Sequence, residues 1–168
     1  MRTDESLLAA VGRSDRLAFR ELYDRHAVRV YRFALSLVRN AALAEEVLQE
    51  TMIAVWKSAA KFRGASKATT WILGIARNQA HSLLRREKRG DRLPEASPPA
   101  PDPASSVELS VKVQEALERL SPQHREVLHL VFYEELSVAE AAEVLAIPAG
   151  TVKSRMFNAR KALAKELA

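Results

Sequence analysis

Residues 137–167 read SVAEAAEVLAIPAGTVKSRMFNARKALAKEL, and they contain the pattern that decides the fold. Ser137 and Glu140 have the spacing of a capping box, which predicts a short helix over residues 138–145. The next five residues, AIPAG, contain a proline and a glycine that interrupt this helix before a longer one begins. A short helix, a tight turn and a second helix together predict a helix-turn-helix.

The second helix, predicted over residues 149–167, has two chemically different faces. At about 100° per residue, one apolar stripe faces a core, and it consists of Val152, Met156, Ala159 and Leu163. Phe157 falls nearly opposite this stripe, among the polar and basic residues Ser154, Asn158, Lys161 and Lys165. An outward phenylalanine is consistent either with packing on another helix or a partner protein, or with contact to DNA.

We favour DNA contact, because an α-helix fits the major groove with its outward side chains near base edges and phosphates. The ring of Phe157 can touch a thymine methyl group there, and Ser154 and Asn158 can hydrogen-bond to bases. The basic side chains of this face would meet phosphates and set the register; they are Lys153, Arg160, Lys161 and Lys165.

Composition excludes several classes of protein. The 168 residues include no cysteine, which rules out disulfide scaffolds, thiolate zinc sites and cysteine nucleophiles. No metal-ligand helix motif, nucleophile elbow or phosphate loop is present, so we predict no enzymatic activity and no cofactor. The first residues lack a signal peptide, and no apolar run reaches the roughly 20 residues of a membrane span. We therefore expect a soluble cytoplasmic protein with no membrane insertion.

A proline-rich segment divides the chain. Five of the seven prolines lie between Pro94 and Pro103, a run that favours extended geometry over helix. We assign residues 89–108 to a flexible linker between two small helical domains, residues 1–88 and 109–168. The linker is either a plain tether or a path that lets both domains reach one duplex.

Both domains are predicted to be all-α. Apolar residues with three- and four-residue spacing indicate long helices before the linker, with Asn40 and Ser66 as start signals for the second and third of them. Residues 4–12 predict a further short helix, and His26 lies beside the core face, where we expect a structural role. After the linker, the pattern predicts helices over residues 108–120 and 122–133, the latter begun by Ser121 and a proline.

Charge is unevenly distributed along the chain. Residues 1–93 contain 18 basic and 10 acidic residues, whereas residues 111–150 contain 3 basic and 7 acidic ones. Residues 151–168 are basic again, with 5 basic residues and 1 acidic residue. A basic end on an otherwise acidic domain favours a directed contact with a polyanion over general adhesion.

Two stretches resemble a known family. Residues 45–86, EEVLQETMIAVWKSAAKFRGASKATTWILGIARNQAHSLLRR, resemble the promoter-melting domain of bacterial sigma factors. Residues 120–163, LSPQHREVLHLVFYEELSVAEAAEVLAIPAGTVKSRMFNARKAL, resemble their domain for the minus-thirty-five element. Two such domains with a short linker are similar to the extracytoplasmic-function (ECF) group.

The resemblance implies a protein that binds core RNA polymerase and promoter DNA, and that is controlled by an anti-sigma factor. It implies polymerase binding through Glu46, Gln49 and Glu50. It implies contacts with the minus-ten element from Phe62, Arg63, Ser66, Lys67, Thr70, Trp71, Arg77, Asn78 and His81. It implies contacts with the minus-thirty-five element from Thr151, Lys153, Ser154, Arg155, Phe157, Asn158, Arg160 and Lys161.

The chain departs from the family pattern at four positions. Ala65 and Ala68 stand where an acid and an aromatic residue are common, which affects the identity of the captured minus-ten base. Ala146 replaces a common glycine at the helix-turn-helix bend, and Asn158 replaces a common basic residue. We expect the latter to change the preferred upstream sequence and to leave the docking mode unchanged.

Two other functions remain compatible with the sequence. One is a stand-alone helix-turn-helix regulator with the first domain as a sensing or dimerising module. The other is a sigma-like decoy that binds a regulatory protein and no DNA. Gel shifts with and without core polymerase distinguish the three, since only a sigma factor needs the polymerase to bind well.

Overall fold

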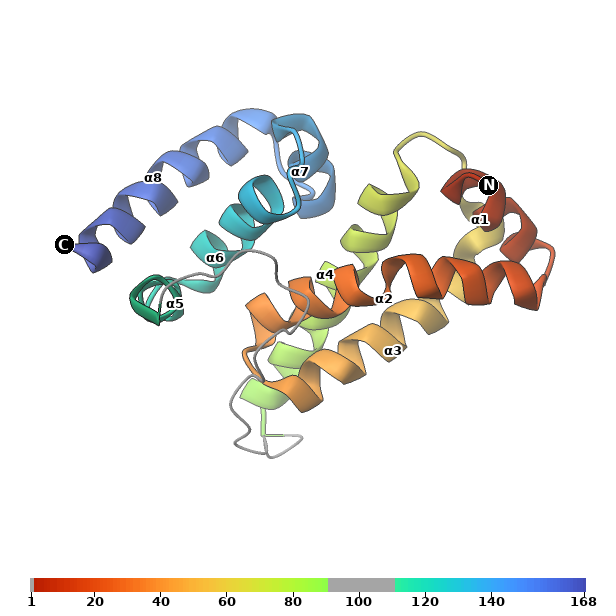
Figure 1. The fold of residues 1–168 in the computed structure, drawn as a ribbon, viewed down its shortest axis with the longest axis horizontal. Helices are drawn as coiled ribbons and strands as arrows, with labels where there is room; N and C mark the ends of the chain where they lie inside the picture. The colour runs from red at the N-terminus through yellow and green to blue at the C-terminus, as the bar shows by residue number, and fades with distance from the viewer. Residues whose placement is uncertain (1, 91–110) are drawn as a thin grey trace.

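The computed structural model describes residues 2–90 and 111–168, and all regular secondary structure within them is helical. The all-α prediction is confirmed. Figure 1 shows two groups of helices, α1–α4 and α5–α8, lying against each other. Most of the predicted linker, residues 91–108, lies outside the described residues. None of the described helices is both long and apolar enough to cross a membrane.

The N-terminal group contains helices α1 (Asp4–Gly12), α2 (Arg16–Val38), α3 (Ala41–Ser58) and α4 (Ala68–Lys88), with a short 3₁₀ turn η1 (Ala59–Lys61) after α3. Helices α2, α3 and α4 pack on one another, and α1 packs on α2. Their apolar faces form one core that includes Leu22, Phe33, Val55 and Ile72. His26 is buried beside this core and lies 3.2 Å from Asp4, which supports the expected structural role.

The two start signals predicted in this group had different outcomes. The side chain of Asn40 accepts a hydrogen bond from the Leu43 amide at 3.0 Å, so its role as a cap is confirmed. Ser66 does not cap α4, because the helix begins one residue later, after Lys67. The Ala68 amide donates instead to the Glu5 carboxylate of α1, at 3.3 Å. The first turn of α4 is thus satisfied by a carboxylate of α1, where we expected the side chain of Ser66 to act as the cap.

The C-terminal group contains α5 (Val111–Glu118), α6 (Pro122–Leu128), a π-helical turn η2 (His129–Tyr133), α7 (Val138–Leu145) and α8 (Ala149–Leu167). Ser121 caps α6 as predicted. The helix expected over residues 122–133 has the predicted bounds, but its second half is the wider π-helical turn η2. The chain leaves η2 through Glu135, whose φ is 56°, and this sharp exit joins α6 to α7.

The helix-turn-helix formed by α7 and α8 matches the predicted bounds. The side chains of Ser137 and Glu140 each accept a hydrogen bond from the other's amide at 3.0 Å, so the capping box is confirmed. Helix α7 ends at Ala146 in the left-handed conformation, with φ 55° and ψ 45°. The amides of Ala146 and Ile147 donate back to the last turn of α7, which is a common helix ending that normally uses glycine.

We expect Ala146→Gly to stabilise the C-terminal group. The left-handed conformation costs an L-residue about 1–2 kcal/mol, a strain that glycine avoids. Glycine has more conformational freedom in the unfolded chain, which offsets about 0.5–1 kcal/mol of this stabilisation. The net gain should raise the melting temperature by a few degrees. The matched control is Ala164→Gly in α8, an exposed position with helical backbone, which should lower it. Equal destabilisation by both changes would show that the bend is not strained.

Candidate nucleic-acid interface

The outward face of α8 presents the residues that the sequence assigned to DNA. The side chain of Phe157 is 68% exposed, and it is flanked by the exposed Lys153, Ser154, Asn158 and Lys161. Thr151 and Arg155 lie at the edges of this face and are partly buried. The opposite face is buried as predicted, with Val152, Met156 and Ala159 in the core. An exposed aromatic ring among donors and cations fits a DNA groove.

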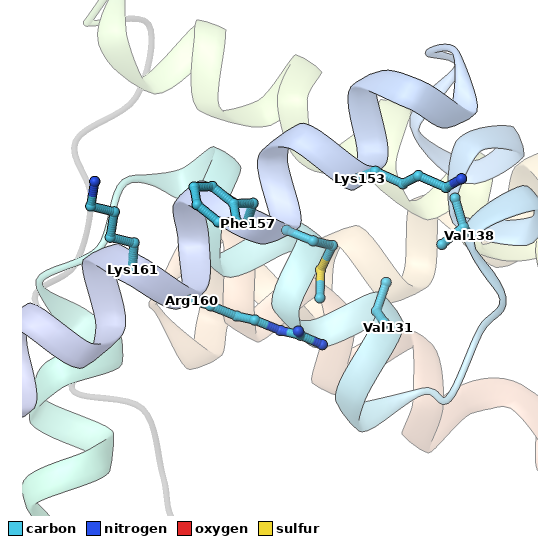
Figure 2. A pocket seen from close by; sticks show the side chains of 7 residues that line it. Val131, Val138, Lys153, Phe157, Arg160 and Lys161 are labelled. Atoms are coloured by element: carbon cyan, nitrogen blue, oxygen red, sulfur yellow. The ribbon is translucent and has the colours of Figure 1, made fainter.

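A shallow apolar hollow lies along one side of this face (Figure 2). Its lining combines apolar side chains with a basic rim, and consists of Val131, Val138, Lys153, Met156, Phe157, Arg160 and Lys161. The guanidinium carbon of Arg160 lies 4.9 Å from the ring centroid of Phe132, a cation–π distance. Figure 2 shows Arg160 reaching toward Val131, whereas Lys161 projects away on the other side of α8. Arg160 is thus held apart from the other cations of the face.

The loop between η1 and α4 carries the first residues assigned to the minus-ten element. The rings of Phe62 and Trp71 pack with centroids 5.2 Å apart and stay half-buried. Arg63 and Lys67 are exposed on the loop, and Ser66 is partly exposed between them. Thr70 is different, because it is buried in the core. The loop therefore combines an aromatic floor with exposed cations, as single-stranded nucleic acid requires.

The remaining residues of this set lie on α4, and only Asn78 is fully exposed. Arg77 and His81, one turn apart, point toward α6 and contact Glu126. The Arg77 guanidinium donates to the Glu126 carboxylate, and Nε2 of His81 lies 3.3 Å from the same carboxylate oxygen. Glu126 is only 1% exposed. Sequence reasoning missed it, because a single acid in a seven-residue helix leaves no periodic signal.

A second ion pair joins the minus-ten loop to α7. Nζ of Lys67 lies 3.2 Å from the Glu140 carboxylate, which also belongs to the capping box. The Ser137 amide and then the Lys67 ammonium lower the pKa of Glu140 below its usual value. The Glu140 carboxylate therefore stays ionised at a lower pH than an ordinary glutamate. Its ion pair with Lys67 and its capping-box bond weaken only as the pH falls through the lowered pKa.

Helix α3 presents a separate face that mixes acidic and apolar groups. Gln49 and Glu50 are exposed, and Glu46 is partly buried one turn earlier. Ile53 continues the same face and is 46% exposed. Ile53 is not among the predicted docking residues, although it lies three residues after Glu50 and therefore on the same helix face. This face of α3 thus offers two carboxylates, an amide and one exposed aliphatic side chain.

Two family matches cover most of the chain. Residues 22–90 match Sigma-70 region 2, and residues 110–163 match Sigma-70 region 4. The chain is 35% identical over 167 residues to the ECF RNA polymerase sigma factor SigM of Mycobacterium tuberculosis, covering 99% of this chain and 85% of SigM. It is 32% identical over 169 residues to SigK of the same species, covering 95% and 90% of the two chains.

This chain belongs to the ECF family of RNA polymerase sigma factors. It directs promoter-specific transcription initiation, and its regions 2 and 4 bind core polymerase and promoter DNA. The stand-alone regulator is not favoured, because region 2 occupies the domain that this alternative would use for sensing or dimerising.

Two solved structures share the fold of this ECF sigma factor. The sigma factor RpoE of Bartonella quintana, in complex with the anti-sigma factor NepR, gives a TM-score of 0.75 at 27% identity, over 89% of this chain and 96% of that one. CnrH, in complex with the cytosolic domain of CnrY, gives a TM-score of 0.74 at 26% identity, over 98% of this chain and 96% of the CnrH chain. Both comparisons span the two groups of helices.

Proposed function

We propose that this sigma factor divides its work between the two domains. Residues 1–88 bind core polymerase and melt the minus-ten element, residues 109–168 read the minus-thirty-five element, and residues 89–108 join them. The observation that carries this assignment is the outward face of α8, where Phe157 is exposed opposite a complete core stripe. The order of the region 2 and region 4 matches supports the same division.

Helix α8 enters the major groove of the upstream element. Ser154, Phe157 and Asn158 contact bases, and Asn158 suits a bidentate contact with adenine. Lys153 and Lys161 contact phosphates, which fixes the register without reading sequence. Thr151 and Arg155 border the groove from the partly buried edges of the helix. The guanidinium of Arg160 packs on the ring of Phe132 and lines the hollow beside α8. We therefore assign Arg160 a smaller part in DNA contact than Lys153 and Lys161.

The loop before α4 captures the melted strand. The packed rings of Phe62 and Trp71 offer a platform for an unstacked base, with Arg63, Ser66 and Lys67 near its backbone. Thr70 supports the loop from the core, and Ala68 is buried as well. Ala65 is exposed and contributes no polar group, so base identity is read by other loop atoms. Arg77, Asn78 and His81 extend the same strand-binding surface along α4.

Helix α3 docks on the polymerase through Glu46, Gln49 and Glu50, and we add Ile53 to this surface. Acids around an exposed aliphatic residue suit a partner with complementary basic and apolar groups. The protein acts in the cytoplasm without enzymatic activity or cofactor. Because both similar structures are complexes with another protein, and the partner of the Bartonella sigma factor RpoE is an anti-sigma factor, we also propose control by an anti-sigma factor.

Transcription in a purified system tests the proposed function. The chain, core polymerase and a pool of genomic fragments from its own organism should yield transcripts with a small set of discrete start sites. Those sites should share two upstream elements at constant spacing. Core polymerase alone provides the control. If the chain adds no discrete start sites, the sigma function fails, and a gel shift without polymerase then tests the regulator alternative.

Two substitutions on α8 should differ in kind. Lys161→Ala should weaken binding of all DNA sequences about equally and lower the salt slope by about 1. Phe157→Ala should cost about 1 kcal/mol or more on the preferred element and much less on a scrambled one, because its contact depends on base identity. Fluorescence titrations on both DNAs, in the presence of core polymerase, measure the difference.

Met156→Ala is the stability control for this pair of substitutions, because Met156 is the buried neighbour of Phe157. It should destabilise the domain by about 2–5 kcal/mol, while Phe157→Ala leaves the melting temperature nearly unchanged. If Phe157→Ala lowers the melting temperature and leaves the ratio of preferred to scrambled binding unchanged, the ring is a packing residue.

Reversing charge on α3 should weaken polymerase binding. Glu50→Lys places a cation where we expect basic partner groups, so association with core polymerase should slow and its salt dependence should change. Asp24→Lys on α2 is the matched control, since it makes the same charge change at an exposed site outside the proposed surface. Surface plasmon resonance at two salt concentrations separates the variants. Identical association rates would refute the docking assignment.

A further inference from the structure

One end of the N-terminal group carries exposed cations from two helices, and we call it the basic end. It consists of Arg13, Arg16 and Arg20 around the start of α2, with Lys57 and Lys61 around the end of α3. None of these five side chains forms an ion pair with a carboxylate of the described residues. Residues 13–20 contain one acid, Asp15, and its carboxylate caps α2. The basic end therefore carries positive charge that the protein itself does not neutralise.

Two close contacts bring the segments of the basic end together. The rings of Phe19 on α2 and Trp56 on α3 meet edge to face, with centroids 5.3 Å apart. A Cβ atom added at Gly12, where α1 ends, would lie 3.0 Å from Cα of Ala60 in η1. Figure 1 shows the start of α2 and the end of α3 at the same end of the group, from which the chain passes into the loop before α4. The basic end is thus continuous with Arg63, the exposed cation of that loop.

The arginines of the basic end oppose the dipole of α2. The free amides at the start of a helix carry partial positive charge, so acids stabilise the first turn and cations destabilise it. Helix α2 has Arg16 directly after its cap and no acid in its first turn. Lys57 differs from these arginines, because a cation in the last turn of α3 suits the negative end of the dipole. The fold explains Lys57, but it does not explain Arg16.

A leucine without a packing role lies among these arginines. The side chain of Leu17 is 79% exposed, which is the highest value for any large apolar side chain that the structure describes. Its neighbours Ala18 and Leu22 on the same helix are fully buried. Leu17 therefore contributes little to the core, and its side chain is available to pack on a deoxyribose or on the face of a base.

We propose that the basic end binds phosphates of the melted strand beyond the nucleotide that the loop captures. The inference rests on the proposed capture of a strand by the loop before α4. Arginine and lysine form charge-assisted bonds with phosphate, and the continuity of the basic end with the loop favours the same strand over a separate acidic protein. A strand held by Phe62 and Trp71 leaves the loop in two directions. One side runs along α4 past Asn78, and the other runs over η1 toward Arg16 and Arg20.

Strand binding by the holoenzyme tests this proposal. The probes are fluorescein-labelled single strands that carry the minus-ten element of a start site found in the transcription experiment above. One probe covers the element alone, and two others extend it by about six nucleotides on the 5′ or the 3′ side. For the unaltered protein, the extension that lies over the basic end should tighten binding about tenfold at low salt.

The variant Arg16→Gln with Arg20→Gln should lose this gain and should bind the short probe as before. Its salt slope on the extended probe should fall by about 1.4, since each phosphate contact of a single strand contributes about 0.7. The control, Lys112→Gln with Arg119→Gln, removes two exposed cations at α5 and should keep the gain. The proposal is overturned if neither extension tightens binding, if the first variant keeps the gain, or if the control loses it equally.

Charge reversal at Arg16 separates a role in binding from a role in the fold. Arg16→Glu should raise the melting temperature by about 1–4 °C, because it places an acid in the first turn of α2, and it should also remove the gain from the extension. Lys112→Glu makes the same charge change in the first turn of α5. It should raise the melting temperature similarly and keep the gain. A lower melting temperature for Arg16→Glu would show that Arg16 serves the fold, and would refute the proposal.

Failure of the proposed function would give a different result. If the holoenzyme does not bind the probe that covers the minus-ten element alone, the assignment of the loop before α4 is wrong. If the holoenzyme binds this probe and the variant at Arg16 and Arg20 keeps the gain, only the role of the basic end is refuted.

Discussion

A carboxylate taken out of water must have cations beside it, and Glu126 finds both of its cations across a domain boundary. This requirement sets α6 against α4 at the level of Arg77 and His81. The neighbouring contacts follow from that placement: η2 reaches Phe33 of α2, and α7 runs along α4 toward Lys67. Apolar packing supports the same placement, because one continuous buried cluster includes residues of both groups, among them Leu73 of α4 and Val144 of α7.

Features with local causes could be predicted from the sequence. Asn40, Ser121 and Ser137 each cap the helix that follows because the bond joins residues three apart. The core stripe of α8 follows from the period of a helix, and so does the exposure of Phe157. Ser66 failed as a cap because the N-terminus of α4 is satisfied by Glu5 of α1, and no local pattern reports a donor 63 residues away in the chain.

For the candidate site, the sequence likewise predicted the residues that carry charge but not the groups that these residues contact. Sequence placed cations on α4 correctly, but a run of arginine and lysine does not say whether the partner anion is phosphate or carboxylate. Arg77 and His81 meet a carboxylate here because an acidic segment folds against them. His129 of η2 stacks on Phe33 of the N-terminal group and on Tyr133 of its own turn. The contact with Phe33 is tertiary, so the pattern of residues 122–133 could not predict it.

The packing of the two domains affects the two recognition faces differently. The outward face of α8 stays open in this packing, because Phe157 and its basic neighbours lie away from the interface. The α4 face is covered, because its cations are the ones that Glu126 needs. The two surfaces that we propose for DNA thus differ in this structure: the outward face of α8 is exposed, whereas Arg77 and His81 of α4 are partly covered by α6. The uneven distribution of charge along the sequence matches this packing, because basic residues of the N-terminal group such as Arg77 and Arg29 pair with Glu126 and Glu134 of the acidic segment.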